Sequence, residues 1–152
     1  GSGKSTLLKI IVGELKADDG VVKISSGVKI GYLSQDLNNL DFKKTALDNL
    51  LDEFSDKTIA ITRAATMDLS LNDLNKPIEK LSRGQQTKVS FLKLLLGRYD
   101  LLILDEPTNH IDIRAKENIE TALEGYDGAI LIASHDRYFV EKLKVNRNIK
   151  LS

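Results

Sequence analysis

The sequence begins with Gly1-Ser2-Gly3-Lys4-Ser5-Thr6, and this short stretch decides the fold. It matches the second half of the phosphate-binding loop G-x-x-x-x-G-K-[ST]. Glycines let such a loop curl until successive N–H groups converge on phosphate oxygens, and the following helix points its positive dipole end at the same anion. The pattern predicts that Lys4 reaches the β- and γ-phosphates of a nucleotide and that Ser5 is a ligand of Mg²⁺.

A turn rich in glycine and serine that only caps a helix would also explain these residues. The full motif has a further glycine and a preceding strand, and both would come before Gly1. We therefore expect the chain to be part of a longer polypeptide, cut inside its own phosphate-binding loop. The motifs further along the chain decide between the two interpretations.

An apolar run followed by two carboxylic acids lies further along the chain, Leu101-Leu102-Ile103-Leu104-Asp105-Glu106. A fully apolar run of this length is typical of a strand buried inside a parallel sheet. Such a strand would deliver Asp105 to the carboxyl edge of the sheet, where it can hold Mg²⁺ through water. Glu106 would face the attacking water as a general base or water-positioning group. A strand that ends in a solvated acidic turn is the alternative, but the phosphate-binding loop upstream favours the catalytic interpretation.

A third motif lies between these two, Leu81-Ser82-Arg83-Gly84-Gln85-Gln86. Ser82 can cap a helix that runs to about Gly97, with Gln85 at the capping-box position. A helix N-terminus with small residues can bind an anion, although a cap of this kind is common and uninformative by itself.

Single polar residues follow two other strand-like runs. Gln35 comes after residues 28–33, and His135 comes after the apolar residues 129–133. A lone glutamine or histidine in such a place is more often a hydrogen-bonding loop residue than a catalytic group. The residues alone therefore assign neither position a role.

Hydrophobic periodicity predicts alternating helices and strands at both ends of the chain, with a polar helical region between them. The expected helices cover residues 4–14, 82–97, 112–123 and 136–143, and the expected strands cover 21–24, 28–33, 101–104 and 129–133. Apolar side chains within residues 46–54 are spaced for one face of a further helix. The pattern predicts an α/β protein, a sheet with flanking helices and an inserted α-helical subdomain at approximately residues 36–98.

Composition limits the classes of protein and of functional site that the chain can represent. The 152 residues suffice for one domain with a hydrophobic core. Lys plus Arg and Asp plus Glu both number 22, so the net charge is zero and predicts no bulk attraction to nucleic acid or to a membrane. The absence of cysteine excludes disulfides, thiolate metal sites and cysteine nucleophiles, and it suits a reducing cytosol. No apolar run approaches the roughly 18 residues of a membrane span.

The order of these motifs resembles that of the ABC (ATP-binding cassette) ATPase domain over nearly the whole chain. The fold that this resemblance implies is a P-loop NTPase sheet. Two stretches resemble the ABC-F branch of that superfamily, D-E-P-T-N-H-I-D at residues 105–112 and S-H-D-R-Y-F at residues 134–139. Transporter cassettes more often have S-A-L-D after D-E-P-T, and ABC-F proteins carry two cassettes in one chain without membrane segments.

The resemblance implies a role for each motif. ATP would be bound by Gly1, Ser2, Gly3, Lys4, Ser5 and Thr6 of the loop, and the γ-phosphate of ATP held by an opposite cassette by Ser82, Gly84 and Gln85. Mg²⁺ would be held by Ser5, Gln35 and Asp105. The catalytic residues would be Glu106, His135 as the switch histidine, and Gln35 as the sensor of Mg²⁺ and the γ-phosphate. Residues 109–112 would form the D-loop at the interface between the cassettes.

Two features set this chain apart within the family. Arg83 stands where the family usually has the first glycine of L-S-G-G-Q, and we expect its side chain to point to solvent while Gly84 keeps the tight position. About 45 residues separate Gln35 from Leu81, too few for the helical subdomain plus the long arm that the first ABC-F cassette inserts there. We therefore expect the second, C-terminal cassette of its parent protein.

These observations predict a cytoplasmic ATPase that binds ATP and Mg²⁺ and drives a two-cassette clamp on the ribosome, as a translation factor or an antibiotic-protection protein. Two alternatives remain. The first is the ATPase subunit of a membrane transporter, against which the residues after D-E-P-T and after His135 argue. The second is a nucleotide-binding module that does not hydrolyse, against which Lys4, Asp105, Glu106 and His135 argue.

Overall fold

Three parallel strands form the centre of the fold, in the order β1-β2-β3. The structure is a computed structural model that describes residues 3–151. Its elements are α1 (Lys4–Ile11), β1 (Ile30–Leu33), α2 (Ala46–Leu51), α3 (Lys57–Thr66), α4 (Leu71–Leu74), the 3₁₀ turn η1 (Ile78–Lys80), α5 (Arg83–Gly97), β2 (Leu101–Asp105), α6 (Ile113–Glu124), β3 (Ala129–Ala133) and α7 (Arg137–Lys142). The α/β fold predicted from the sequence is confirmed.

The central strand β2 pairs in parallel with both neighbours. Ile103 lies opposite Tyr32 on β1 and opposite Leu131 on β3. Parallel strands need long crossover connections, and here α2 to α5 connect β1 to β2 while α6 connects β2 to β3. All three strands therefore end at the same edge of the sheet, which is where the polar residues predicted to be functional follow them.

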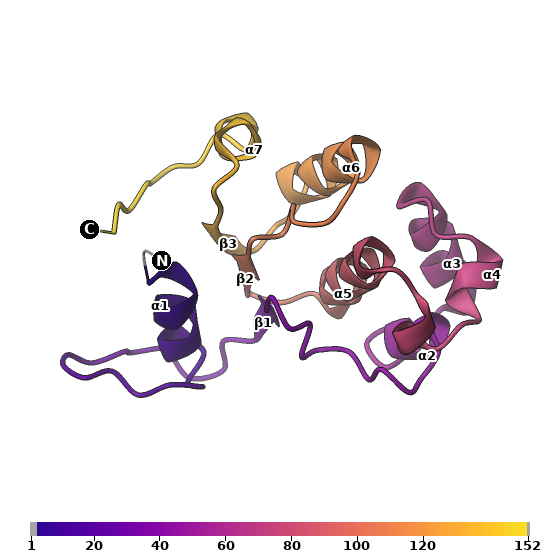
Figure 1. Cartoon of the computed structure of the whole chain (residues 1–152). Helices are drawn as coiled ribbons and strands as arrows, with labels where there is room; N and C mark the ends of the chain where they lie inside the picture. The colour runs from indigo at the N-terminus through magenta and orange to yellow at the C-terminus, as the bar shows by residue number, and fades with distance from the viewer. Residues whose placement is uncertain (1–2, 152) are drawn as a thin grey trace.

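Helices cover both faces of this sheet, with α1 on one side and α5 and α6 on the other (Figure 1). On the α1 side, Leu8 packs with Ile103. On the opposite side, Leu102 and Leu104 belong to the large core that also contains Phe91 of α5. Side chains of successive strand residues point to opposite faces, so β2 needs an apolar residue at every position. This explains its unbroken apolar run.

The helices α2, α3 and α4 lie together at the end of the molecule far from α1 (Figure 1). The apolar stripe predicted within residues 46–54 is confirmed, because Ala46, Leu47 and Leu50 of α2 are buried. The helix α2 packs against α5, which joins this helical region to the sheet. These helices occupy the predicted subdomain at approximately residues 36–98, and its boundaries stay a prediction.

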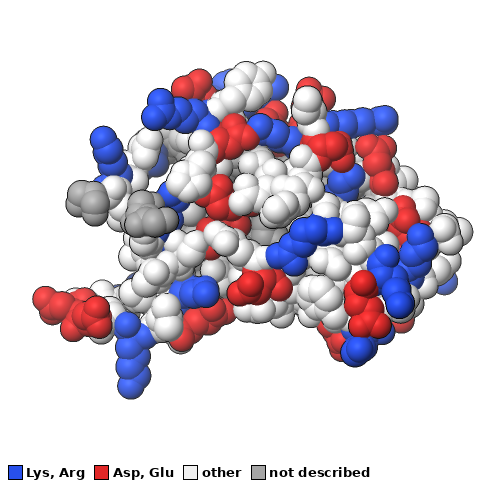
Figure 2. Space-filling view, viewed as in Figure 1, with Lys and Arg blue, Asp and Glu red and all other residues white. Residues whose placement is uncertain are grey.

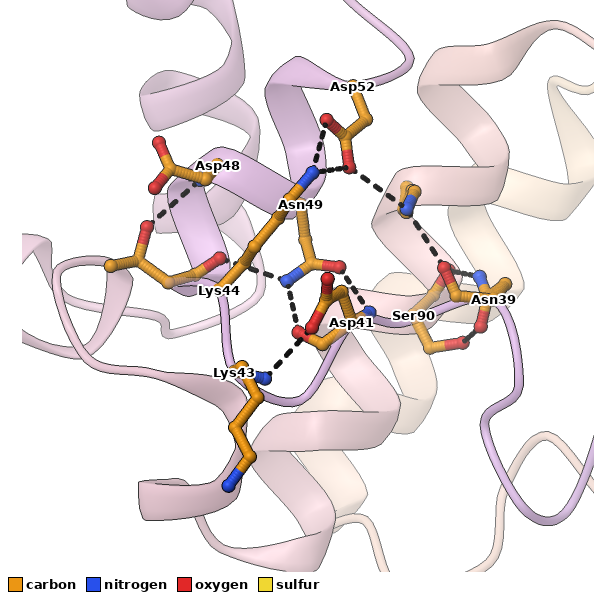
Figure 3. Close-up of polar contacts among 10 residues, drawn as sticks. Asn39, Asp41, Lys43, Lys44, Asp48, Asn49, Asp52 and Ser90 are labelled. Atoms are coloured by element: carbon orange, nitrogen blue, oxygen red, sulfur yellow. Dashed lines mark hydrogen bonds and ion pairs between the residues drawn. The ribbon is translucent and has the colours of Figure 1, made fainter.

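A buried amide organises the start of α2. Asn49 is fully buried, and its Oδ1 accepts a hydrogen bond of 2.8 Å from the backbone N–H of Asp41. Its Nδ2 donates to the carbonyl oxygens of Asp41 and Thr45, at 2.9 and 3.0 Å. Figure 3 shows Asn49 inside a wider set of polar contacts that includes Asn39 and Ser90. Because its donors and acceptor are satisfied, the amide can be buried without a large penalty.

Two elements differ most from the sequence-based prediction, a strand that is absent and a helix that ends early. Residues 21–24 were expected to form a strand but have no regular structure, and Val21 is 81% exposed. A strand forms only where another strand pairs with it. In the described part of the chain, β2 pairs with β1 from Ile30 onward, and residues 21–24 lie outside this pairing. The first helix ends at Ile11 rather than at residue 14, because Gly13 takes a left-handed φ of 84°.

The remaining helices begin and end within a residue or two of their predicted limits. Across residues 3–151, no helix combines the length and the apolar character needed to cross a bilayer. Basic and acidic side chains are interspersed over the face shown in Figure 2. That face therefore offers no single-sign patch for an oppositely charged partner.

Candidate functional site

The phosphate-binding loop is described from Gly3 onward, and the predicted ligands Gly1 and Ser2 lie outside the described residues. Gly3 precedes α1 and has a left-handed φ of 75°, a conformation that glycine adopts without strain. Within residues 3–151, no side chain caps the first turn of α1. The N–H groups of this turn, which includes Lys4, Ser5 and Thr6, therefore have no side-chain cap, as the predicted phosphate-binding role requires.

The two acids stand where β2 ends. Asp105 and Glu106 are only 3% and 8% exposed. The backbone of Glu106 is left-handed, with φ of 52°, and its N–H donates to the carbonyl of Ala133 at 2.8 Å. A non-glycine residue in this conformation is strained, and such strain collects at functional sites. The turn holds the Glu106 carboxylate at the sheet edge instead of letting the strand continue.

The Glu106 carboxylate is bonded through one oxygen only. Its Oε2 accepts a hydrogen bond of 3.1 Å from the backbone N–H of His135. Nε2 of His135 lies 3.3 Å from Oε1, without the geometry of a hydrogen bond. Oε1 is thus a buried carboxylate oxygen that no group of the described residues satisfies. A buried acceptor of this kind is suited to hold a water molecule.

Gln35 brings the predicted metal ligands together. Its Nε2 donates to Ser5 Oγ at 3.1 Å and lies 3.4 Å from Asp105 Oδ1. A half-turn of the terminal amide would present its oxygen to the same space, because the two amide ends are nearly equivalent in shape. Hydroxyl, amide and carboxylate oxygens are the hard donors that Mg²⁺ prefers, so these three residues fit that ion.

Lys4 and His135 meet at the same edge. Nζ of Lys4 lies 3.2 Å from Nε2 and 3.5 Å from Nδ1 of His135. The ammonium can only donate, so a ring nitrogen of His135 acts as acceptor in this arrangement. Four segments distant in the sequence therefore converge on one edge of the sheet, and they contribute Lys4, Gln35, the pair Asp105 and Glu106, and His135.

The motif around Ser82 begins α5 as predicted. Ser82 Oγ accepts from the N–H of Gln85 at 3.2 Å, and Gln85 Oε1 accepts from the N–H of Ser82 at 3.0 Å. The capping box is thereby confirmed. Ser82 and Gln85 bond to each other rather than to the residues at the sheet edge. The side chains of Ser82 and Gln85 are thus used within the motif itself.

Arg83 and Gly84, which follow Ser82, contact loops that lead to the sheet edge. Arg83 is exposed, as expected, but its guanidinium also donates a hydrogen bond to the backbone carbonyl of Gln35. A Cβ atom on Gly84 would meet the carbonyl oxygen of His110 at 2.5 Å, a distance that real Cβ atoms do not show. The start of α5 is therefore fitted between the loop after β1 and the predicted D-loop.

Sequence reasoning missed a small cavity behind the acids. It measures about 230 Å³, and its walls include Arg83, Thr87, Asp105, Glu106 and Asn109. It also missed Tyr32, whose hydroxyl is buried without a hydrogen-bond partner among residues 3–151. Burial, followed by the charges of Asp105 and two further acids, raises the pKa of Tyr32 to about 12. No local pattern could have revealed either feature, because both depend on packing.

The fold is that of an ATP-binding cassette. The ABC transporter family model matches residues 1–109, and the chain belongs to this family. A dimeric bacterial ABC transporter cassette, MJ0796, superimposes with a TM-score of 0.77 and 26% sequence identity, over 93% of this chain and 73% of that one.

Relatives of the ABC-F type indicate to which branch of this family the chain is similar. The ribosome protection protein VmlR of Bacillus subtilis is 38% identical over 93% of this chain. ABC transporter F family member 2 of Arabidopsis thaliana is 36% identical over 99% of it. The predicted resemblance to the ABC-F branch is thus confirmed. The chain spans 26% and 23% of the lengths of these two relatives, about a quarter in each case.

Proposed function

We propose that this cassette binds ATP with Mg²⁺ and hydrolyses it, and that hydrolysis drives a two-cassette clamp that acts on the ribosome in the cytoplasm. The observation that carries the proposal is the convergence of Lys4, Gln35, Asp105, Glu106 and His135 at one edge of the sheet. A cation for phosphate, oxygen ligands for Mg²⁺ and a buried carboxylate for water are the parts that phosphoryl transfer needs.

In this proposal the loop at residues 1–6 surrounds the phosphates. The N–H groups of the first turn of α1 face the phosphate oxygens, and Lys4 exchanges its contact with His135 for the β- and γ-phosphates. Ser5, Gln35 and Asp105 would hold Mg²⁺. When bound, that ion would neutralise negative charge on the phosphate oxygens.

Glu106 orients the attacking water through Oε1, the buried oxygen that has no hydrogen-bond partner among residues 3–151. The water oxygen forms a bond to the γ-phosphorus as the bond to the β–γ bridging oxygen breaks. The water proton passes toward the carboxylate, and the electron pair leaves with ADP. His135 lies beside Glu106 and Lys4, from where it can contact the transferred phosphoryl group.

The partner is a second cassette. Ser82, Gly84 and Gln85 would bind the γ-phosphate of ATP held by that cassette, and residues 109–112 would lie at the interface. ATP between two cassettes holds them closed, and its hydrolysis lets them open. VmlR is a ribosome protection protein, which supports the ribosome as the target. We place this chain as the second cassette of its parent, a translation factor or an antibiotic-protection protein.

A transporter subunit is the second candidate function, favoured by the likeness to the MJ0796 transporter cassette.

The experiment that tests the proposed function uses the full-length protein that contains this cassette. Glu106→Gln keeps the shape of the side chain but removes its basicity, so ATPase turnover should fall about a hundredfold with nucleotide still bound. The variant should also sediment with ribosomes when ATP is present.

Glu117→Gln, on the exposed part of α6, is the matched control and should keep turnover and sedimentation as in the wild type. Unchanged turnover in Glu106→Gln would refute hydrolysis by this site. Turnover lost without ATP-dependent ribosome binding would leave the transporter candidate in place.

A further inference from the structure

Arg83 connects the start of α5 to the loop after β1. Its guanidinium donates to the backbone carbonyl of Gln35, 48 residues earlier in the chain. The side chain begins in the first turn of α5, and its own carbonyl accepts a hydrogen bond of 3.0 Å from Thr87 Oγ1. Arg83 is thus bonded through its backbone carbonyl to its own helix and through its guanidinium to the neighbouring loop.

Gln35 continues this connection to the proposed metal site. Its side-chain amide contacts Ser5 Oγ at 3.1 Å and Asp105 Oδ1 at 3.4 Å. Arg83 is therefore bonded directly to one proposed Mg²⁺ ligand, Gln35, which in turn contacts the other two. Groups that fix the orientation of a metal ligand commonly control metal affinity as strongly as a ligand does.

Further contacts anchor α5 to the same loop and to the D-loop. Nζ of Lys93 donates to the carbonyl of Asn39 at 2.8 Å, and Asn39 also bonds to Ser90, as Figure 3 shows. Nζ of the buried Lys88 lies 3.0 Å from a carboxylate oxygen of Asp112. These contacts hold α5 in place without Arg83. Removing the Arg83 guanidinium should therefore free Gln35 without unfolding the helix.

We propose that Arg83 is a positioning residue that holds Gln35 against Ser5 and Asp105 and so links the start of α5 to the Mg²⁺ site. The inference rests on the proposed function, in which this end of α5 faces ATP held by the second cassette. A displacement of α5 when that ATP binds or leaves would then reach the cassette's own metal site through Arg83 and Gln35.

The test measures Mg²⁺-dependent binding of ATP to the full-length protein, for the wild type and for Arg83→Ala. The half-saturating Mg²⁺ concentration should rise about tenfold in the variant, the low end of the range for lost ligand orientation. ATP affinity at saturating Mg²⁺ should stay within about twofold, because Arg83 touches no proposed phosphate ligand. The melting temperature should not change.

The sign of the shift separates positioning from simple electrostatics. Removing a positive charge near a metal site strengthens cation binding by Coulomb's law, whereas a freed Gln35 weakens it. An unchanged or lower half-saturating Mg²⁺ concentration would overturn the proposal. So would a parallel loss of Mg²⁺ affinity, ATP affinity and thermal stability, which would indicate a purely structural role.

Arg63→Ala is the matched control, since Arg63 is an exposed arginine of α3 in the same helical region. It should leave the Mg²⁺ dependence as in the wild type. The readout is binding and not turnover. A wild type that binds Mg²⁺ and ATP without hydrolysing ATP would count against the proposed function alone, and the Arg83 comparison would still decide this inference.

Discussion

Nζ of Lys4 lies 3.2 Å from Nε2 of His135, although 131 positions separate the two residues in the chain. The contact exists because the N-terminus of α1 and the end of β3 meet at the carboxyl edge of a parallel sheet. It also shows that the lysine reaches the residues that follow the strands. A phosphate bound there would face Lys4, His135 and Glu106 at once.

Lys4→Ala should weaken ATP binding itself by about tenfold or more, because it removes a charge-assisted contact to the β- and γ-phosphates. An ATP titration of the full-length protein measures this change in dissociation constant. Lys9→Ala is the control, since Lys9 lies in the last turn of the same helix. Equal affinities in Lys4→Ala and in the wild type would remove Lys4 from the site.

Gly84→Ala tests the fit between α5 and the predicted D-loop. The added Cβ would lie 2.5 Å from the His110 carbonyl oxygen, and a backbone atom cannot move aside as a flexible side chain can. We expect the free energy of unfolding to fall by about 1–3 kcal/mol, the usual cost of overpacking. Turnover should fall as well, because residues 109–112 would shift.

Gly125→Ala is the matched control for this prediction. Its Cβ would have its nearest neighbour, the Thr121 carbonyl oxygen, at 4.0 Å, which is an ordinary contact. Denaturant unfolding and ATPase assays of both variants make the comparison. If the two alanine variants were equally stable, the close approach at Gly84 would have no energetic consequence.

Asp136→Asn should reveal a pH-dependent contribution to stability. The hydrogen bond from Lys116, followed by that from the Phe139 backbone N–H, lowers the pKa of Asp136. A lowered folded-state pKa contributes stability that is fully present above the unfolded value of about 3.9 and is lost as the pH falls through the folded value. Asparagine keeps the cap of α7 but not the charge.

The variant should therefore be less stable than the wild type by up to about 1 kcal/mol near pH 7, and the difference should shrink as the pH falls below about 4 and Asp136 is protonated. Thermal unfolding between pH 3 and pH 8 measures it. Asp127→Asn, at an exposed loop position, is the control. A difference that stayed constant across this range would mean that charge plays no part in the contribution.

The sequence by itself determined the features that depend on near neighbours in the chain. The capping box of Ser82 and Gln85 spans one helical turn, so its residues identify it without any tertiary information. The apolar run of β2 identified a strand buried on both faces, because side chains alternate along a strand. The order of the motifs then predicted that Lys4, Asp105 and Glu106 belong to one ATP-binding site.

Only the tertiary structure decided which distant groups meet. Residues 21–24 have the composition of a strand, yet strand formation depends on a pairing partner that no local pattern specifies. Arg83 is exposed as expected, but packing of α5 beside the loop after β1 also puts the Gln35 carbonyl within reach of its guanidinium. Gly84 likewise depends on the path of the chain at His110. Such contacts join residues far apart in sequence, so their geometry is set by how the helices pack on the sheet and not by spacing along the chain.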